Sequence, residues 1–323
     1  MTKLFKIAGL IAVAGLILTG CPARADNYPS KPIKFVVGFP PGGGNDILAR
    51  VIGQKLSERV GQPVLVENKP GANAIIATEH VAKSAPDGYT LYVGASGAMT
   101  FNPGTYERLP YDSVKDFAPI TQIASFPLII AVHPSVPANS IKELIALAKS
   151  KPGQIYYASG STPFHVATTL FKKEAGIDLV HVPYKGSAQS IAAVVGGQVS
   201  VVTVDAPPTA PHLKAGKLRG LAVTGPRRTA IAPDVPTMAE AGLPGYEVVL
   251  WTGLFAPAGT PQNVIDRLYQ EVSAILKLDD VKARLVSLGY DAGGMKPAEF
   301  SAILKADRDK WTQVAKEGNI RAE

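Results

Sequence analysis

Residues 33–50 combine an apolar strand, a glycine turn and the start of a helix. The run Ile33–Phe39 suits a buried parallel strand, and apolar residues recur at helical spacing over residues 47–56. Three consecutive glycines, Gly42 to Gly44, lie between them and allow a sharp turn and a close approach to a ligand. The N–H groups and dipole of a helix N-terminus favour a negative group. This segment therefore predicts an anion site, for which a carboxylate is the simplest ligand.

Two other interpretations of this turn were weighed. A glycine-rich turn can be a plain tight connection, and the segment alone leaves that alternative open. Nucleotide binding is not expected, because no Gly-Lys-Ser/Thr follows the turn and the glycines do not fit Gly-x-Gly-x-x-Gly.

The N-terminus has the pattern of an export signal. Lys3 and Lys6 precede the apolar stretch 7–18, which is too short for a membrane span. We expect a signal peptide over residues 1–25, cleaved after Ala25. The alternative is a lipoprotein signal, which would leave the chain anchored at Cys21.

Composition narrows the classes of function. Cys21 is the only cysteine, and the five histidines have no metal-ligand spacing, so we expect no disulfide, metal or cofactor. Removing Lys3, Lys6 and Arg24 from the 33 basic residues leaves 30 against 26 acidic ones, an ordinary surface balance. No basic run is interleaved with aromatic residues, so nucleic-acid binding is not expected.

The order of elements predicts two α/β lobes. The chain begins as β-α-β-α-β over residues 33–93, strands follow at residues 120–124 and 128–132, and a capping box of Ser140 and Glu143 begins the next helix. About 300 mature residues exceed what one core usually organises. We predict two doubly wound lobes, lobe 1 from residues 26–124 plus 250–323 and lobe 2 from residues 125–249, with the C-terminal helices packing on lobe 1. The two chain crossings, near residues 124–127 and 248–251, would form a hinge.

Ligands of open α/β sheets lie beyond the carboxyl ends of the strands, so the turns there are candidate walls of a cleft. Four such turns stand out, at residues 39–46, 94–97, 159–162 and 204–205. Phe39 could lie against the organic part of a ligand, although an aromatic residue at a strand end more often belongs to the core. Asp46 is expected to cap the first helix, His165 could donate to a ligand oxygen, and Asp205 could accept from a ligand amine or a water. The candidate ligand-binding residues are Phe39, Pro41, Gly42, Gly43, Gly44, Asn45, Ser96, Ser159, Gly160, Ser161, Thr162, His165 and Asp205.

Several motifs, spread over nearly the whole chain, resemble one family, the periplasmic solute receptors of tripartite tricarboxylate transporters, also called Bug receptors. The matching segments are Tyr28-Pro29-Ser30-Lys31-Pro32-Ile33, Phe39 to Arg50, Val66 to Ala72, Ala85 to Leu91, Val182-Pro183-Tyr184-Lys185-Gly186, Val235-Pro236-Thr237-Met238 and Ala256 to Pro261.

The resemblance implies a two-lobed, type II-like periplasmic binding protein. Such a receptor closes on a small carboxylate, commonly a di- or tricarboxylic acid, an acidic amino acid or an aromatic acid, and then docks on the integral membrane subunits of the transporter. It would be non-catalytic and monomeric. Ser159-Gly160-Ser161 stands where the family usually has Gly-x-Gly, and Thr169 stands where an acidic residue is common, so side-chain hydroxyls are expected to replace bare backbone.

Two other functions stay open from the sequence. Gly94-Ala95-Ser96-Gly97-Ala98 nearly fits a nucleophile elbow, with Asp205 and His212 as partners, which would make the chain an exported serine hydrolase. A ligand sensor for a membrane signalling partner would use the same cleft as a transport receptor.

Overall fold

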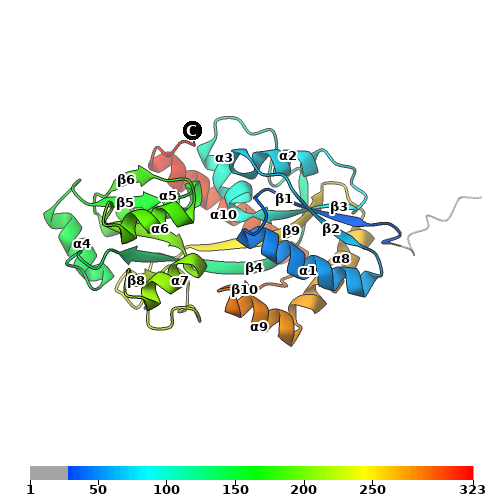
Figure 1. Ribbon diagram of the computed structural model, residues 1–323. Helices are drawn as coiled ribbons and strands as arrows, with labels where there is room; N and C mark the ends of the chain where they lie inside the picture. Colours follow the sequence, from blue (N-terminus) through cyan, green and yellow to red (C-terminus); the bar gives the residue numbers. More distant parts are fainter. Residues whose placement is uncertain (1–27, 323) are drawn as a thin grey trace, which may run out of the picture.

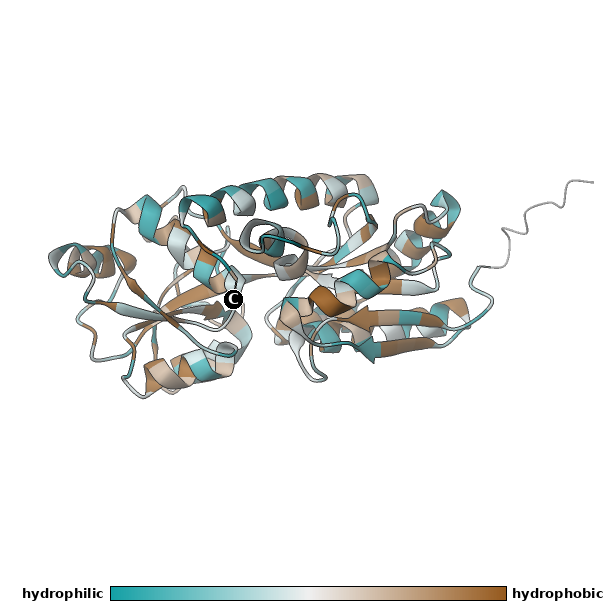
Figure 2. Cartoon of the chain, turned by 90° about the horizontal axis from the view of Figure 1, so that it is seen from above, coloured by the Kyte–Doolittle hydropathy of each residue, from teal (hydrophilic) through white to brown (hydrophobic). Residues whose placement is uncertain are grey.

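The computed structural model describes residues 28–322. The predicted signal peptide and both candidate processing sites, Ala25 and Cys21, lie outside these residues. Figure 1 shows two groups of strands side by side, each with its own helices. Apolar residues concentrate on the strands and on the helix faces turned toward them, as Figure 2 shows.

Lobe 1 is built on the sheet β2-β1-β3-β9-β4, with β10 on the other side of β4. Strands β1, β2 and β3 are parallel, which confirms the predicted β-α-β-α-β start. Apart from its first helix, the helical segments of lobe 1 that precede β4 (Phe117–Val132) are short. The elements are β1 (Ile33–Val37), α1 (Gly44–Val60), β2 (Val64–Asn68), η2 (Ala72–Ala74), α2 (Ile75–Ala82), β3 (Thr90–Ala95), η3 (Gly97–Phe101), α3 (Asn102–Thr105), β9 (Val249–Pro257) and β10 (Asp291–Ala292).

Lobe 2 is built on β6-β5-β7-β4, with β8 on the other side of β4. Strands β5, β6 and β7 are parallel to one another and β7 runs antiparallel to β4. Half of the Ser140–Glu143 capping box predicted for the next helix is present: Ser140 Oγ accepts the Glu143 N–H, but Glu143 accepts the N–H of Asn139 rather than that of the cap residue Ser140. The elements are α4 (Ile141–Ser150), β5 (Tyr156–Ser159), α5 (Thr162–Ala175), β6 (Val180–Pro183), α6 (Ser187–Val195), β7 (Val201–Asp205), α7 (Ala206–Lys214) and β8 (Arg219–Val223).

One strand, β4 (Phe117–Val132), joins the two lobes. We expected separate strands at residues 120–124 and 128–132, and the structure corrects this to a single strand of 16 residues. Its first part pairs with β9, and residues 128–132 pair with β7 and β8. The predicted lobe boundaries fall inside β4 and at the start of β9, so both crossings run side by side in one paired ribbon.

The C-terminal helices cover lobe 1, and the last of them also reaches lobe 2. Helices α8 (Gln262–Leu276) and α9 (Asp279–Ser287) pack on the lobe 1 core. Helix α10 (Pro297–Glu317) buries Phe300 and Leu304 in lobe 1, whereas Trp311 and Ala315 belong to the core of lobe 2. The structure thus adds a third connection between the lobes.

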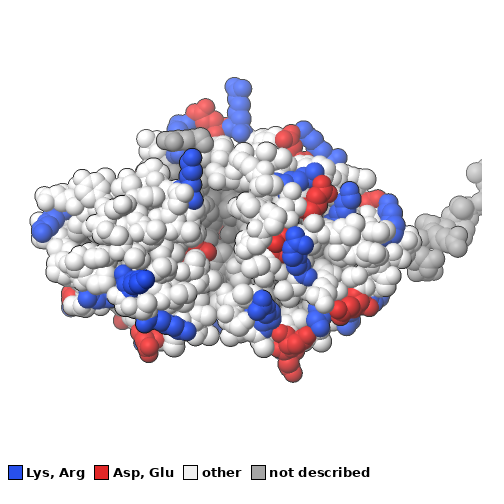
Figure 3. Space-filling model, viewed as in Figure 1, with Lys and Arg blue, Asp and Glu red and all other residues white. Residues whose placement is uncertain are grey.

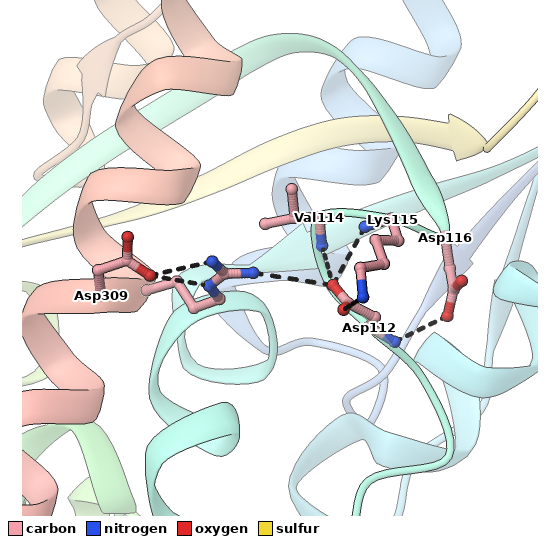
Figure 4. A network of polar contacts seen from close by, with 6 residues as sticks. Asp112, Val114, Lys115, Asp116 and Asp309 are labelled. Atoms are coloured by element: carbon pink, nitrogen blue, oxygen red, sulfur yellow. Dashed lines mark hydrogen bonds and ion pairs between the residues drawn. The ribbon is translucent and has the colours of Figure 1, made fainter.

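An ion-pair network holds the middle of α10 against the loop before β4 (Figure 4). Arg308 lies between Asp309 of its own helix, at 3.0 Å, and Asp112 of the loop, at 3.8 Å. Burial disfavours the charge on Asp112, but the N–H groups of Val114 and Lys115 outweigh it and lower the pKa of this carboxyl. The loop is therefore anchored to the helix that spans both lobes.

Candidate functional site

A cavity of about 670 Å³ lies between the lobes. The hollow in Figure 3 is bordered mostly by uncharged residues. Ten of the thirteen predicted site residues line the cavity, namely Phe39, Pro41, Gly43, Gly44, Asn45, Ser96, Gly160, Ser161, Thr162 and Asp205. Each of the four predicted turns contributes, so the wall comes from the carboxyl ends of strands in both lobes.

The first glycine turn presents the N-terminus of α1 to the cavity. Gly42 has φ 82°, which favours glycine, whereas Gly43 is extended and precedes the helix. The buried Asp46 accepts the Gly42 N–H at 2.8 Å and a hydrogen bond from Asn68 at 3.0 Å. Asp46 is not the predicted helix cap, because the N-cap is Gly43; it holds the preceding turn instead, which leaves the first N–H groups of α1 free to bind an anion.

Asn45 and Gly44 fit against residues from distant segments. Thr252 of β9 donates to Asn45 Oδ1 at 2.5 Å, which turns the amide into a fixed donor at the cavity wall. A Cβ at Gly44 would lie 2.2 Å from the Tyr290 hydroxyl, so glycine at this position leaves room for the tyrosine.

Ser96 closes the second turn of lobe 1. It is only 2% exposed, follows β3 and lies directly before η3. Its hydroxyl accepts the Trp251 N–H at 3.3 Å. Serine here ties the β3 turn to β9 and still lines the cavity.

The lobe 2 turn presents the N-terminus of α5. A Cβ at Gly160 would lie between 2.2 and 2.8 Å from the backbone of Gly186, which also donates its N–H to the Gly160 carbonyl at 2.9 Å. The turns before α5 and α6 are thereby locked together. The hydroxyls of Ser161 and Thr162 make no hydrogen bond within the described residues and line the cavity, so they are available to a ligand.

Three predicted site residues lie outside the cavity lining. Gly42 lies in the α1 turn and donates its N–H to Asp46. Ser159 is bonded to His181 Nε2 at 2.7 Å, and His165 Nδ1 is bonded to the Tyr157 hydroxyl at 2.8 Å. Burial, followed by the charges of His181 and Lys172, lowers the pKa of His165 to about 4. His165 is therefore a neutral packing residue. We expected these three residues to contact the ligand, but the structure places them outside the cavity lining.

Asp205 and Lys185 are the charged side chains among the described residues that line the cavity. Ser187 donates to Asp205 Oδ1 at 2.5 Å. Burial raises the pKa of Asp205, against the effect of Ser187 and of its own backbone. Lys185 is exposed at the start of the α6 turn. The polar groups that line the cavity are thus mostly neutral.

Sequence reasoning missed several lining residues, among them Trp251, Tyr290, Phe126 and the α6 turn. The α6 turn repeats the strand–glycine–helix pattern of the first turn, so the same signal would have found it. No local pattern marks Trp251 or Tyr290, because tertiary packing alone brings them to the cavity. Phe126 and Tyr290 meet edge to face with ring centroids 5.3 Å apart.

The hydrolase alternative is not supported by the geometry. Ser96 is bonded to a backbone N–H, and Asp205 is bonded to Ser187 rather than to a histidine. His212 lies in the last turn of α7, whereas Asp205 precedes its first. Over residues 28–322, no group of three or more His, Cys, Asp and Glu side chains could hold a metal ion. Within the same range, no helix combines the length and apolar character needed to cross a membrane.

Comparisons with known proteins agree with the resemblance seen in the sequence. The profile of the tripartite tricarboxylate transporter family receptor, TctC, matches residues 48–320. Protein BugT of Bordetella pertussis is 33% identical over 98% of this chain and 98% of its own length.

Two solved structures have the same fold. Rpa4515 of R. palustris with adipate is 36% identical, covers 91% of this chain and 99% of its own, and has a TM-score of 0.81. MatC (Rpa3494) of Rhodopseudomonas palustris with bound malate is 31% identical, covers 89% and 99%, and has a TM-score of 0.77. These relatives are solute-binding receptors, not enzymes, and the chain belongs to the tripartite tricarboxylate transporter receptor (TctC/Bug) family of periplasmic binding proteins.

Proposed function

We propose that this protein captures a small carboxylate in the interlobe cavity and delivers it, as a monomer, to the membrane subunits of a tripartite tricarboxylate-type transporter. The observation that carries the proposal is that the N-termini of α1 and α5, one from each lobe, line one cavity whose wall is mostly neutral. Helix N-termini bind anions through free N–H groups and the helix dipole. Adipate and malate in the two related structures are carboxylates, which supports the same ligand class here.

The first test is calorimetric titration of the processed protein with dicarboxylates, tricarboxylates, acidic amino acids and aromatic acids. We expect saturable binding of one class and no binding of the matching primary amides, which keep the shape and lose the charge. Trp251 lines the cavity and the chain has 2 tryptophans, so a Trp311→Phe variant gives a fluorescence signal from the cavity alone. Silence across all the acids would refute the proposal.

Side-chain recognition is tested at the α5 turn. Ser161→Ala or Thr162→Ala should weaken binding by about 0.5–3 kcal/mol each if the hydroxyls bond a charged carboxylate. Ser150→Ala, on α4, removes a hydroxyl that bonds only the Leu147 carbonyl and serves as the control. Transport is tested by uptake of the bound acid into vesicles that carry the membrane subunits, with and without the receptor.

A further inference from the structure

Asp205 has the position of a helix cap but cannot make the cap. It ends β7 and precedes α7 directly. An aspartate there normally accepts the N–H of the second or third helical residue. In this chain those residues are Pro207 and Pro208, which have no N–H, and Asp205 makes no side-chain cap hydrogen bond.

One oxygen of the Asp205 carboxylate is therefore left without a hydrogen-bond donor from the helix. Ser187 bonds Oδ1, and among the described residues no donor bonds Oδ2. Asp205 is only partly buried, so Oδ2 is open to the cavity, and burial raises the pKa of this carboxyl. Within the described residues, the Asp205 side chain has one hydrogen-bond donor and makes no helix cap, and it lines the cavity.

The rest of the polar wall offers donors instead. The first turns of α1 and α5 present N–H groups, and Ser161 and Thr162 add hydroxyls, all of which suit the carboxylate of a ligand. Ser187, the first residue of α6, already donates to Asp205, so Asp205 occupies that helix end. A ligand carboxylate at α6 would meet the like charge of Asp205, which favours α1 and α5 as its place.

Tyr290 lies beside both parts of the wall. Its hydroxyl lies against Gly44 at the start of α1. Burial, and then the charge of Asp205, raise the pKa of Tyr290 to about 12, so the hydroxyl keeps its proton near neutral pH. The α1 turn, which can bind an anion, and Asp205, which can accept a hydrogen bond, therefore suit one compact ligand.

We infer that the ligand carries a hydrogen-bond donor, an ammonium or a hydroxyl group, beside its carboxylate, and that Asp205 selects for this donor. This inference rests on the proposed function and narrows it, from carboxylates in general to amino- or hydroxycarboxylates. Asp205 is then a specificity-determining residue whose second oxygen is available to a donor on the ligand.

Matched ligands test the inference. Succinate, malate and aspartate differ only in bearing hydrogen, hydroxyl or ammonium at one carbon. Glutarate, 2-hydroxyglutarate and glutamate repeat the comparison with one more carbon, and adipate and 2-aminoadipate with two. In calorimetric titrations we expect a substituted acid to bind at least tenfold more tightly than the plain diacid of its length.

Two variants separate recognition from structure. Asp205→Asn keeps an oxygen for Ser187 and removes the charge, so it should lose at least tenfold in affinity for an amino acid and less for a hydroxy acid. Asp205→Ala should remove the preference for either. Unliganded Asp205→Asn should melt at the same or a higher temperature than the parent, since it removes a partly buried charge that has one hydrogen-bond donor. Asp178→Asn, an exposed acid of the same lobe, is the control and should change neither property.

Plain diacids that bind as tightly as their substituted partners would overturn the inference while leaving the proposed function intact. So would a preference that survives in Asp205→Ala. Tighter binding of plain diacids that is lost in Asp205→Ala would show a protonated Asp205 donating to a second carboxylate, and would also overturn it. If no acid binds at any length, the proposed function fails and the inference fails with it.

Discussion

Asp46 illustrates how a residue outside the cavity sets the geometry of the site. It is 2% exposed, accepts the Gly42 N–H at 2.8 Å, and pairs with Arg50 and Asn68. Despite the opposing effect of burial, these bonds lower the pKa of its carboxyl. The glycine turn therefore depends on an ionised carboxylate four residues after Gly42.

Asp46→Asn should destabilise the protein and loosen the turn. We expect a loss of about 1–3 kcal/mol in the free energy of unfolding, because a hydrogen-bonded buried charge is replaced by a weaker acceptor. Affinity for the carboxylate should fall as well. Urea unfolding measures the first effect and calorimetry the second. Arg50→Gln removes only a half-exposed partner and should cost less than about 1 kcal/mol; an equal loss in the two variants would contradict the role given to the turn.

His165 predicts a pH dependence of stability. Its pKa falls from the ordinary value of 6.5 to about 4 in the folded protein, so the unfolded chain binds more protons between these values. Stability should be full above about pH 6.5 and should fall as the pH drops through 4. His165→Gln should flatten this part of the stability curve, and His181, whose pKa is also lowered, should leave a residual slope. An unchanged curve would contradict the prediction.

Local sequence patterns predicted which residues follow a strand, but they did not always predict where the side chains of those residues point. Ser159 and His165 lie in the expected turn and helix, yet their side chains turn to His181 and Tyr157. Trp251 and Tyr290 come from strand β9 and the segment before β10, far along the chain from the glycine turns. Which distant side chain fills a cavity is decided by packing, and periodicity within one element carries no such information.

At the scale of elements, two prolines explain why the sequence did not predict β4 as one continuous strand. Pro119 and Pro127 have no N–H and therefore suggest breaks in a strand. Pro119 stands where the register with β9 shifts, and Pro127 stands at the end of the pairing with β9, just before β4 begins to pair with β7 and β8. Both prolines occupy positions where a ladder hydrogen bond is not needed. The sequence predicted the strands themselves, and the structure shows that they are one.

Helix α10 gives a prediction at the same scale. Its Trp311 is 2% exposed and stacks on Phe101, with ring centroids 4.6 Å apart. Trp311→Ala should lower the free energy of unfolding by about 3–5 kcal/mol, because it leaves a large cavity where the helix meets lobe 2. Lys305→Ala, exposed on the same helix, should change it by less than about 0.5 kcal/mol. Chemical denaturation compares the two, and similar midpoints would show that α10 does not hold the lobes together.

On the scale of the whole molecule, the sequence motifs were enough to identify the family and the two-lobed fold. They did not predict that α10 connects the lobes. Helical periodicity shows that a helix buries one face, but not which surface covers that face. Phe300 packs in a lobe 1 core, whereas Trp311 stacks on Phe101 of lobe 1 and joins the core cluster of lobe 2, and only the assembled structure reveals the change of partner.

The shared elements predict that both lobes unfold together. Strand β4 supplies hydrogen bonds to β9 and β10 in lobe 1 and to β7 and β8 in lobe 2, so neither sheet is complete without it. Loss of one lobe would also expose half of the buried face of α10. Differential scanning calorimetry of the unliganded protein should therefore give one transition, with equal calorimetric and van't Hoff enthalpies. A bound carboxylate at 100 times its Kd should stabilise that single transition by about 2.7 kcal/mol. Two separate transitions, or a ligand that shifts only one of them, would mean that β4 and α10 join the lobes without coupling their stability.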